Sequence, residues 1–83
     1  MESMIQATPK IIIDGKKRLT IENHSGIITF DDKKISVDSK LGIIDILGSN
    51  LEILYIGGYT IIVSGALKSV IYRETEKWTK NWW

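Results

Sequence analysis

Residues able to carry out acid–base or nucleophilic chemistry are few in this sequence. His24 is the single histidine, cysteine is absent, and no motif places a serine nucleophile beside a base. His24 is the first candidate for proton transfer, because histidine changes charge near neutral pH. It stands within Asn23-His24-Ser25-Gly26, a string typical of a four-residue turn. We therefore expect an exposed turn histidine rather than a catalytic one.

Aspartates are the remaining candidates, as paired carboxylates. Four of the five are candidates for such pairing: Asp31, Asp32, Asp38 and Asp45. Adjacent aspartates in a turn usually accept hydrogen bonds from backbone amides, and this is the role we expect for Asp31 and Asp32. Asp45 lies within the apolar run 41–47, on the opposite side from Ile44 and Ile46 if side chains alternate. That pattern predicts a core face carrying the two isoleucines and a surface position for Asp45.

Other chemistries lack their usual signatures. One histidine without thiolates cannot fill a zinc site, and no Walker, dinucleotide or metal-ligand spacing is present. The pairs Lys16-Lys17 and Lys33-Lys34 follow turns without a glycine-rich strand-to-helix loop, which favours solvation and edge protection over phosphate binding. A net charge of +1 does not indicate a nucleic-acid partner. We expect no cofactor, metal or small-molecule substrate, and no enzymatic activity.

Chain length limits how the protein is stabilised. A chain of 83 residues forms one domain, and chains of this size bury only about 60% of their unfolded surface. With no cysteine for a disulfide and no ligand set for a structural zinc, association with another chain is the remaining route to any additional stability that the domain needs. The start MESMIQATPK does not resemble a signal peptide, and the apolar stretches are too short to span a membrane. We expect a cytoplasmic protein.

Hydrophobic periodicity predicts an all-β domain. Side chains alternate with period two, isoleucine and valine are abundant, and turn residues interrupt the pattern at short intervals. About eight antiparallel strands are predicted, over 10–13, 17–23, 26–31, 34–38, 41–47, 51–56, 59–64 and 66–73. Such spacing is typical of a meander that forms a small sandwich or barrel. Residues 1–8 are expected to be an N-terminal tail, 9–73 a single β domain and 74–83 a tryptophan-rich helix or tail.

Several predicted strands carry apolar side chains on both faces, as in Ile61-Ile62-Val63. An antiparallel sheet with one wet face should alternate more cleanly. Two interpretations are open: central strands wrapped on both faces, or an exposed patch covered by a second subunit or a partner. The second makes Ile62 a candidate partner-binding residue.

The tail RETEKWTKNWW changes the periodicity. Trp78 and Trp82 are four residues apart, and Glu76 and Lys80 form a favourable pair at the same spacing, which predicts a short helix. The tail could cover the apolar outer face, dock onto a partner, or lie weakly at a membrane surface. Candidate partner-binding residues here are Trp78, Trp82 and Trp83.

The stretch from PKIIIDGKK to SVIYRE resembles the YabP/YqfC family of sporulation proteins. The resemblance covers about residues 9–74. The matching features are Ile21-Glu22-Asn23-His24 with Gly26, Phe30-Asp31, Leu41-Gly42, Gly48 with Asn50-Leu51, and Gly65 before Ile71-Tyr72. The first of these is closer to the YqfC branch. The resemblance implies expression in the mother cell during spore formation, no known catalysis and a membrane-protein partner, and it transfers no catalytic or binding residues.

Together these observations predict a non-catalytic structural or adaptor protein of endospore formation that acts through protein–protein contacts. The alternative is a self-assembling β scaffold that polymerises through its strand edges. Expected partners are a second copy of the chain and a sporulation membrane protein. The resemblance places the protein in the mother-cell cytoplasm, or peripherally at the forespore membrane.

Overall fold

Six β-strands make up the regular structure of the computed structural model, which describes residues 8–74. The strands are β1 (Lys10–Asp14), β2 (Arg18–Glu22), β3 (Gly26–Phe30), β4 (Lys34–Ser39), β5 (Gly42–Gly57) and β6 (Thr60–Arg73). The all-β prediction is confirmed. No helix occurs in this part of the chain, and so none that could cross a membrane.

All six strands belong to one antiparallel sheet, in the order β1-β2-β6-β5-β4-β3. Within residues 8–74, β1 and β3 each pair on one side only, so the sheet is open at both ends. The prediction of a sandwich or a closed barrel was therefore wrong. The sheet is continuous because both long central strands run through it, and each carries a short hairpin on its outer side.

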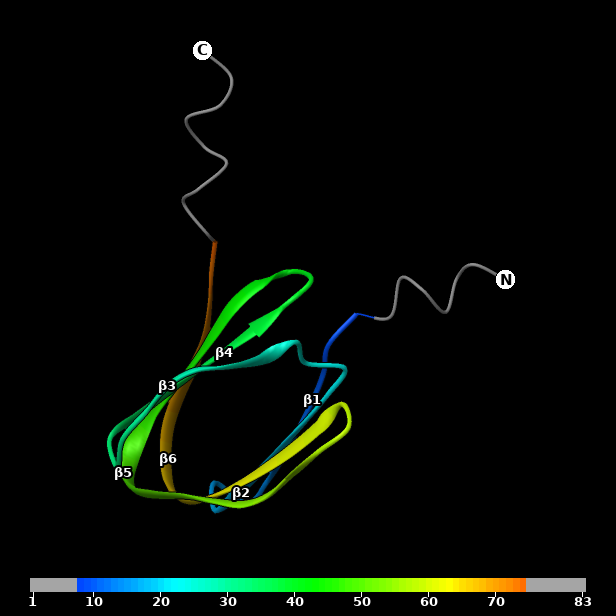
Figure 1. Cartoon of the computed structure of the whole chain (residues 1–83). Helices are drawn as coiled ribbons and strands as arrows, with labels where there is room; N and C mark the ends of the chain where they lie inside the picture. Colours follow the sequence, from blue (N-terminus) through cyan, green and yellow to red (C-terminus); the bar gives the residue numbers. More distant parts are fainter. Residues whose placement is uncertain (1–7, 75–83) are drawn as a thin grey trace.

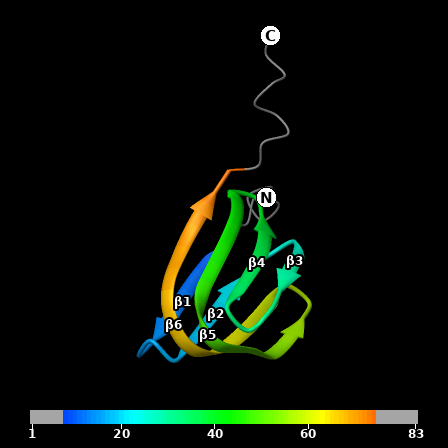
Figure 2. The same cartoon turned by 90° about the vertical axis from the view of Figure 1, so that its left-hand side faces the viewer.

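The long hairpin of β5 and β6 bends sharply, so that the two halves of the sheet curve around a common interior (Figures 1 and 2). One half contains β3, β4, the start of β5 and the end of β6; the other contains β1, β2, the end of β5 and the start of β6. The core fills the space between them. Among the described residues it contains ten buried apolar side chains: Leu19, Ile21, Ile35, Val37, Ile44, Ile46, Leu51, Ile61, Val63 and Leu67. Burial of this apolar surface is the main stabilising term.

The prediction of eight strands was wrong because two glycine-containing segments are bends rather than turns. Gly48 and Gly65 lie where β5 and β6 cross closely, and pairing continues through the crossing from Ser49↔Ala66 to Glu52↔Ser64. A Cβ on Gly48 would overlap the carbonyl oxygen of Ala66. Glycine therefore allows two long strands to fold over without breaking their ladder.

Turn chemistry agrees with the sequence at the β3–β4 turn and differs by one residue at the β1–β2 turn. The β1–β2 turn has positive φ at Gly15 (58°) and Lys16 (63°), one residue later than the Asp14-Gly15 pair expected from sequence. In the β3–β4 turn, the Asp31 carboxylate accepts the backbone N–H groups of Lys33 (2.7 Å) and Lys34 (2.9 Å). These hydrogen bonds lower the pKa of Asp31 and confirm its expected capping role.

The predicted C-terminal helix lies outside the described residues, apart from Glu74. This residue follows the end of β6 without regular structure. The N-terminal tail is described only at Thr8, whose carbonyl oxygen accepts a hydrogen bond from the Asn23 side chain at 3.0 Å.

Candidate interaction surface

A row of four side chains crosses the outer face of the half-sheet that contains β1 and β2. Strand register places Ile12 opposite Thr20, Thr20 opposite Ile62, and Ile62 opposite Tyr55. Because Leu19, Ile21, Ile61 and Val63 point into the core, these four neighbours point outward. We call Ile12, Thr20, Ile62 and Tyr55 the outer row. Ile12 is 43% exposed and Tyr55 53%, and Ile62 is half-buried.

Polar rows flank the outer row on both sides. On one side the register aligns Lys10, Glu22, Thr60 and Gly57, and on the other it aligns Asp14, Arg18, Ser64 and Glu52. The outer row is largely apolar, with Thr20 as its one hydroxyl-bearing aliphatic member, and charged groups border it. Such a surface has the composition of a protein-binding site, in which the apolar centre supplies affinity and the rim selects the partner. This face is therefore the candidate functional site.

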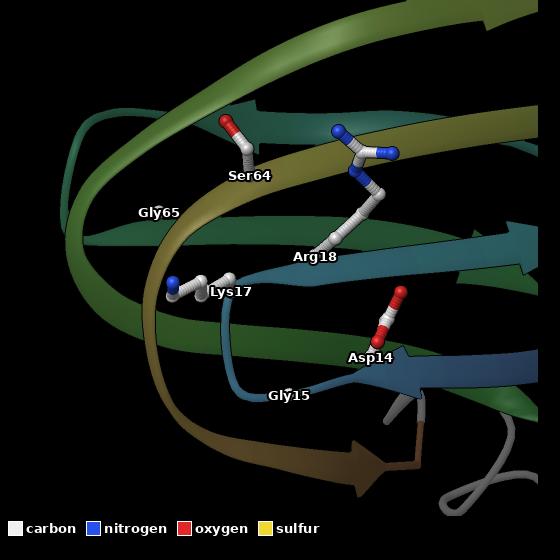
Figure 3. Close-up of a pocket in the computed structure, with 6 residues that line it drawn as sticks. All are labelled: Asp14, Gly15, Lys17, Arg18, Ser64 and Gly65. Carbon is white, nitrogen blue, oxygen red and sulfur yellow. The ribbon is translucent and has the colours of Figure 1, made fainter.

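One end of the outer face is hollowed into an open depression of about 750 Å³ (Figure 3). Its walls are Asp14, Gly15, Lys17, Arg18, Ser64 and Gly65. The depression sits at the bend of β6, where Gly65 donates its backbone N–H to the carbonyl oxygen of Lys17 at 3.1 Å. Asp14 stands opposite Arg18 in the register, so a carboxylate offsets the guanidinium. This mixed charge suits the rim of a protein interface better than a site for a free anion.

A hydrogen-bonded network occupies the outer face of the other half-sheet. The Asp45 carboxylate accepts hydrogen bonds from the Ser36 hydroxyl at 2.6 Å, from Arg73 Nε at 2.8 Å and from an Arg73 terminal nitrogen at 3.1 Å. Asp45 does lie opposite the core face that carries Ile44 and Ile46, as the sequence predicts. It is buried rather than at the surface, however, and is only 7% exposed.

Ionisation of Asp45 is favoured by this network. The hydrogen bonds from Arg73, followed by the one from Ser36, hold the pKa of Asp45 below its ordinary value, although burial acts in the opposite direction. The pKa of Asp45 is lower in the folded state than in the unfolded state. The network therefore contributes its full stability at pH values above 3.8, the ordinary pKa of the carboxyl group. The contribution is lost as the pH falls through the lowered pKa.

Asp45→Asn should lower the free energy of unfolding at pH 7 by about 1–2 kcal/mol, because a buried carboxylate loses its charge-assisted bonds to a partly exposed arginine. The difference from the unmodified protein should stay constant from pH 7 to about pH 5 and shrink below about pH 4. Urea unfolding at several pH values measures it. Asp32→Asn changes the same charge on an exposed turn and should have little effect. If the difference in unfolding free energy between Asp45→Asn and the unmodified protein stayed the same down to about pH 2, the stabilisation could not come from the ionised Asp45 carboxylate.

His24 is buried, contrary to the prediction of an exposed turn histidine; it is 9% exposed. Its Nδ1 accepts the backbone N–H of Gly26 at 2.9 Å, and its own backbone N–H and that of Asn23 donate to the carbonyl oxygen of Tyr59. The Nε2 atom is buried without a hydrogen-bond partner among the described residues. The ring thus belongs to the connection between β2 and β3.

Of the residues predicted to bind a partner, Ile62 lies in the outer row. Trp78, Trp82 and Trp83 lie outside the described residues. Within residues 8–74, no three His, Asp or Glu side chains gather closely enough to hold a metal ion.

Comparison with known proteins places this geometry in a family. The model of the YabP family matches residues 6–79, which is most of the chain. The chain belongs to the YabP family. The family resemblance seen in the sequence is thereby confirmed, and the closer likeness to the YqfC branch stays a prediction. A search of curated proteins finds no match to this chain.

Three members of the outer row in this YabP-family chain were not singled out from the sequence as binding residues: Ile12, Thr20 and Tyr55. Tyr55 faces Ile62 only because β5 shifts its register between Ile53 and Tyr55. Ile12 carries a partial signal, since three consecutive isoleucines in a strand must expose at least one side chain on the outer face.

Proposed function

We propose that this YabP-family protein is a non-catalytic adaptor of endospore formation that binds other proteins through the outer row. The observation that carries the proposal is the apolar strip across four strands, with Ile12 and Tyr55 about half exposed and charged residues on both sides. Family membership supports the sporulation setting. A membrane protein of the sporulating cell and a second copy of the chain are the proposed partners, in the mother-cell cytoplasm or at the periphery of the forespore membrane.

Ile62→Lys tests this function, because it places a charge at the centre of the outer row while leaving the core face of β6 intact. In the host endospore former, we expect a strain that carries only this variant to produce heat-resistant spores as poorly as a strain lacking the protein. Ile71→Lys is the matched control, since it makes the same substitution on the same strand at an exposed position of the other half-sheet, outside the outer row and its flanking polar rows. It should support spore formation at the unmodified level.

Both variants should melt within a few degrees of the unmodified protein, because both positions face outward. A pull-down from sporulating cells, with each variant as bait, then identifies proteins retained by Ile71→Lys and lost with Ile62→Lys. Full spore formation by the folded Ile62→Lys variant would overturn the proposal.

A scaffold that polymerises through strand edges is the second candidate function, and the sheet's two open ends support it. A polymer grows with concentration, whereas an adaptor forms an oligomer of fixed size. Light scattering across a hundredfold range of concentration separates the two.

A further inference from the structure

Four stretches of strand within residues 8–74 have an open side: β1, β3, the part of β5 after its bend and the part of β6 after its bend. The part of β6 after its bend pairs regularly from Ser69 to Arg73, but it contains no acidic residue that could complement a second copy of itself. Two of the others are irregular, because register shifts interrupt β3 between Ile27 and Thr29 and β5 between Ile53 and Tyr55. Such bulges hinder the approach of another strand. The β1 edge is regular from Lys10 to Asp14, and β1 is the first strand in the order of the sheet.

Alternation along β1 decides which of its backbone groups face the open side. The carbonyl oxygen of Asp14 turns toward the β2 side, where it accepts the N–H of Lys17 at 3.1 Å. Backbone direction alternates along a strand, so Lys10 and Ile12 also face β2. The N–H and carbonyl groups of Ile11 and Ile13 then point to the open edge, ready to pair with another strand.

The sequence of β1, Lys-Ile-Ile-Ile-Asp, complements itself when reversed. We propose that β1 forms the interface of a two-fold dimer, in which β1 of a second copy of this chain pairs antiparallel with it about Ile12. Lys10 then faces Asp14 of the second copy, and Asp14 faces its Lys10. Each pair of Ile11 with Ile13 across the interface exchanges both of its backbone hydrogen bonds.

Charges on β2 extend this complementarity. Glu22 is the cross-strand neighbour of Lys10, and Arg18 is that of Asp14. Four charged side chains then lie side by side on the outer face across the interface: Glu22, Lys10, Asp14 of the second copy and Arg18 of the second copy. Their charges alternate in sign. Opposite charges in directly facing positions stabilise a sheet, and like charges destabilise it.

The same charges reject other arrangements of the two strands. A parallel pair would place Lys10 beside Lys10 and Asp14 beside Asp14. An antiparallel pair displaced by two residues would leave one charge of each strand facing an isoleucine. Pro9, which lacks an N–H, limits pairing beyond Lys10. A lone edge lysine would only discourage association, whereas Lys10 together with Asp14 selects one register.

Exposed apolar surface is covered by this pairing. Ile12 is 43% exposed and Ile13 52% exposed in the single chain. In the dimer, Ile12 of each copy meets Ile12 of the other, so that the two outer rows join into one continuous strip. This inference specifies the self-association included in the proposed function, and it doubles the surface available to a membrane-protein partner.

Charge reversal on the full chain tests the pairing. We expect Lys10→Glu and Asp14→Lys each to raise the dimer dissociation constant at least tenfold, measured by sedimentation velocity. Mixing the two variants should restore dimers as heterodimers, because Glu at position 10 of one chain then faces Lys at position 14 of the other, and Asp14 faces Lys10. If an equimolar mixture of the two variants formed no more dimer than either variant alone, the proposal would be overturned.

Ile13→Pro provides a second test that does not depend on the charges. It removes an N–H that faces the open edge and leaves the ladder to β2 intact, so the folded protein should become monomeric. A folded Ile13→Pro variant that remains dimeric would overturn the proposal, as would an unmodified protein that is monomeric at several hundred micromolar. Neither result would alter the spore phenotype of Ile62→Lys, so the adaptor function is judged separately.

Discussion

Gly65→Ala is expected to lower the free energy of unfolding by about 3–5 kcal/mol, a large share of the 5–15 kcal/mol typical of a small domain. Gly65 has a φ of +138°, a backbone conformation that costs an L-residue about 1–3 kcal/mol. A Cβ there would also lie 2.7 Å from the carbonyl oxygen of Asn50 and 2.9 Å from Cα of Leu51. Both contacts are with backbone atoms, so neither can be relieved by a side-chain rotation.

Gly58→Ala is the matched control for this prediction. Gly58 also has a positive φ of +45°, but a Cβ there meets no atom within 4 Å. Only the conformational cost applies, and we expect a loss of about 1 kcal/mol. Urea denaturation of both variants gives the comparison. Equal losses would show that the crossing of β5 and β6 at Gly65 tolerates a side chain.

The fold class and the core face could be predicted because they depend on local pattern. Alternation around Ile44 and Ile46 placed both in the core, where both are fully buried. The length of β5 and β6 could not be predicted in this way. Gly48-Ser49-Asn50 has the composition of a turn, and only the partner strand reveals that hydrogen bonding continues past it.

Long-range partners explain the other differences. Asp45 was expected at the surface because its face of the strand is the outer one. Its burial comes from Ser36 on β4 and Arg73 at the end of β6, the latter 28 residues away. Register between distant strands is set by the whole sheet, and no local spacing in the sequence encodes it.

The candidate surface was predictable to a similar extent. Apolar side chains on both faces left two interpretations open, wrapped central strands or an exposed patch, and Ile62 was chosen on the basis of the second. Which residues would stand beside it depended on strand order. β2 and β5 flank β6 in the sheet, although β2 lies about 40 residues before β6 in the chain, and this order brings Thr20 and Tyr55 to either side of Ile62.

His24→Ala is expected to lower the free energy of unfolding by about 2–3 kcal/mol, although the residue lies in a connection between strands. The substitution leaves the backbone N–H of Gly26 without its 2.9 Å acceptor and opens a cavity where a buried ring had been. The substitution also loosens the β2–β3 connection. In that connection the backbone N–H groups of Asn23 and His24 donate to the carbonyl oxygen of Tyr59, and the backbone N–H of Ser25 donates to the carbonyl oxygen of Asp38. These bonds join the β2–β3 connection to the β5–β6 turn and to β4.

Two further variants separate the acceptor from the volume of the ring. In His24→Asn the side-chain oxygen can take the place of Nδ1, so the acceptor is kept while most of the ring is lost. In His24→Phe the volume is kept and the acceptor is lost. If the hydrogen bond to Gly26 dominates, thermal melts should rank the proteins as unmodified, Asn, Phe and Ala in falling stability. The Nε2 atom has no partner among the described residues, so its loss in the Asn variant carries no hydrogen-bond cost there. A Phe variant as stable as the unmodified protein would show instead that ring packing, and not the bond to Gly26, holds this connection in place.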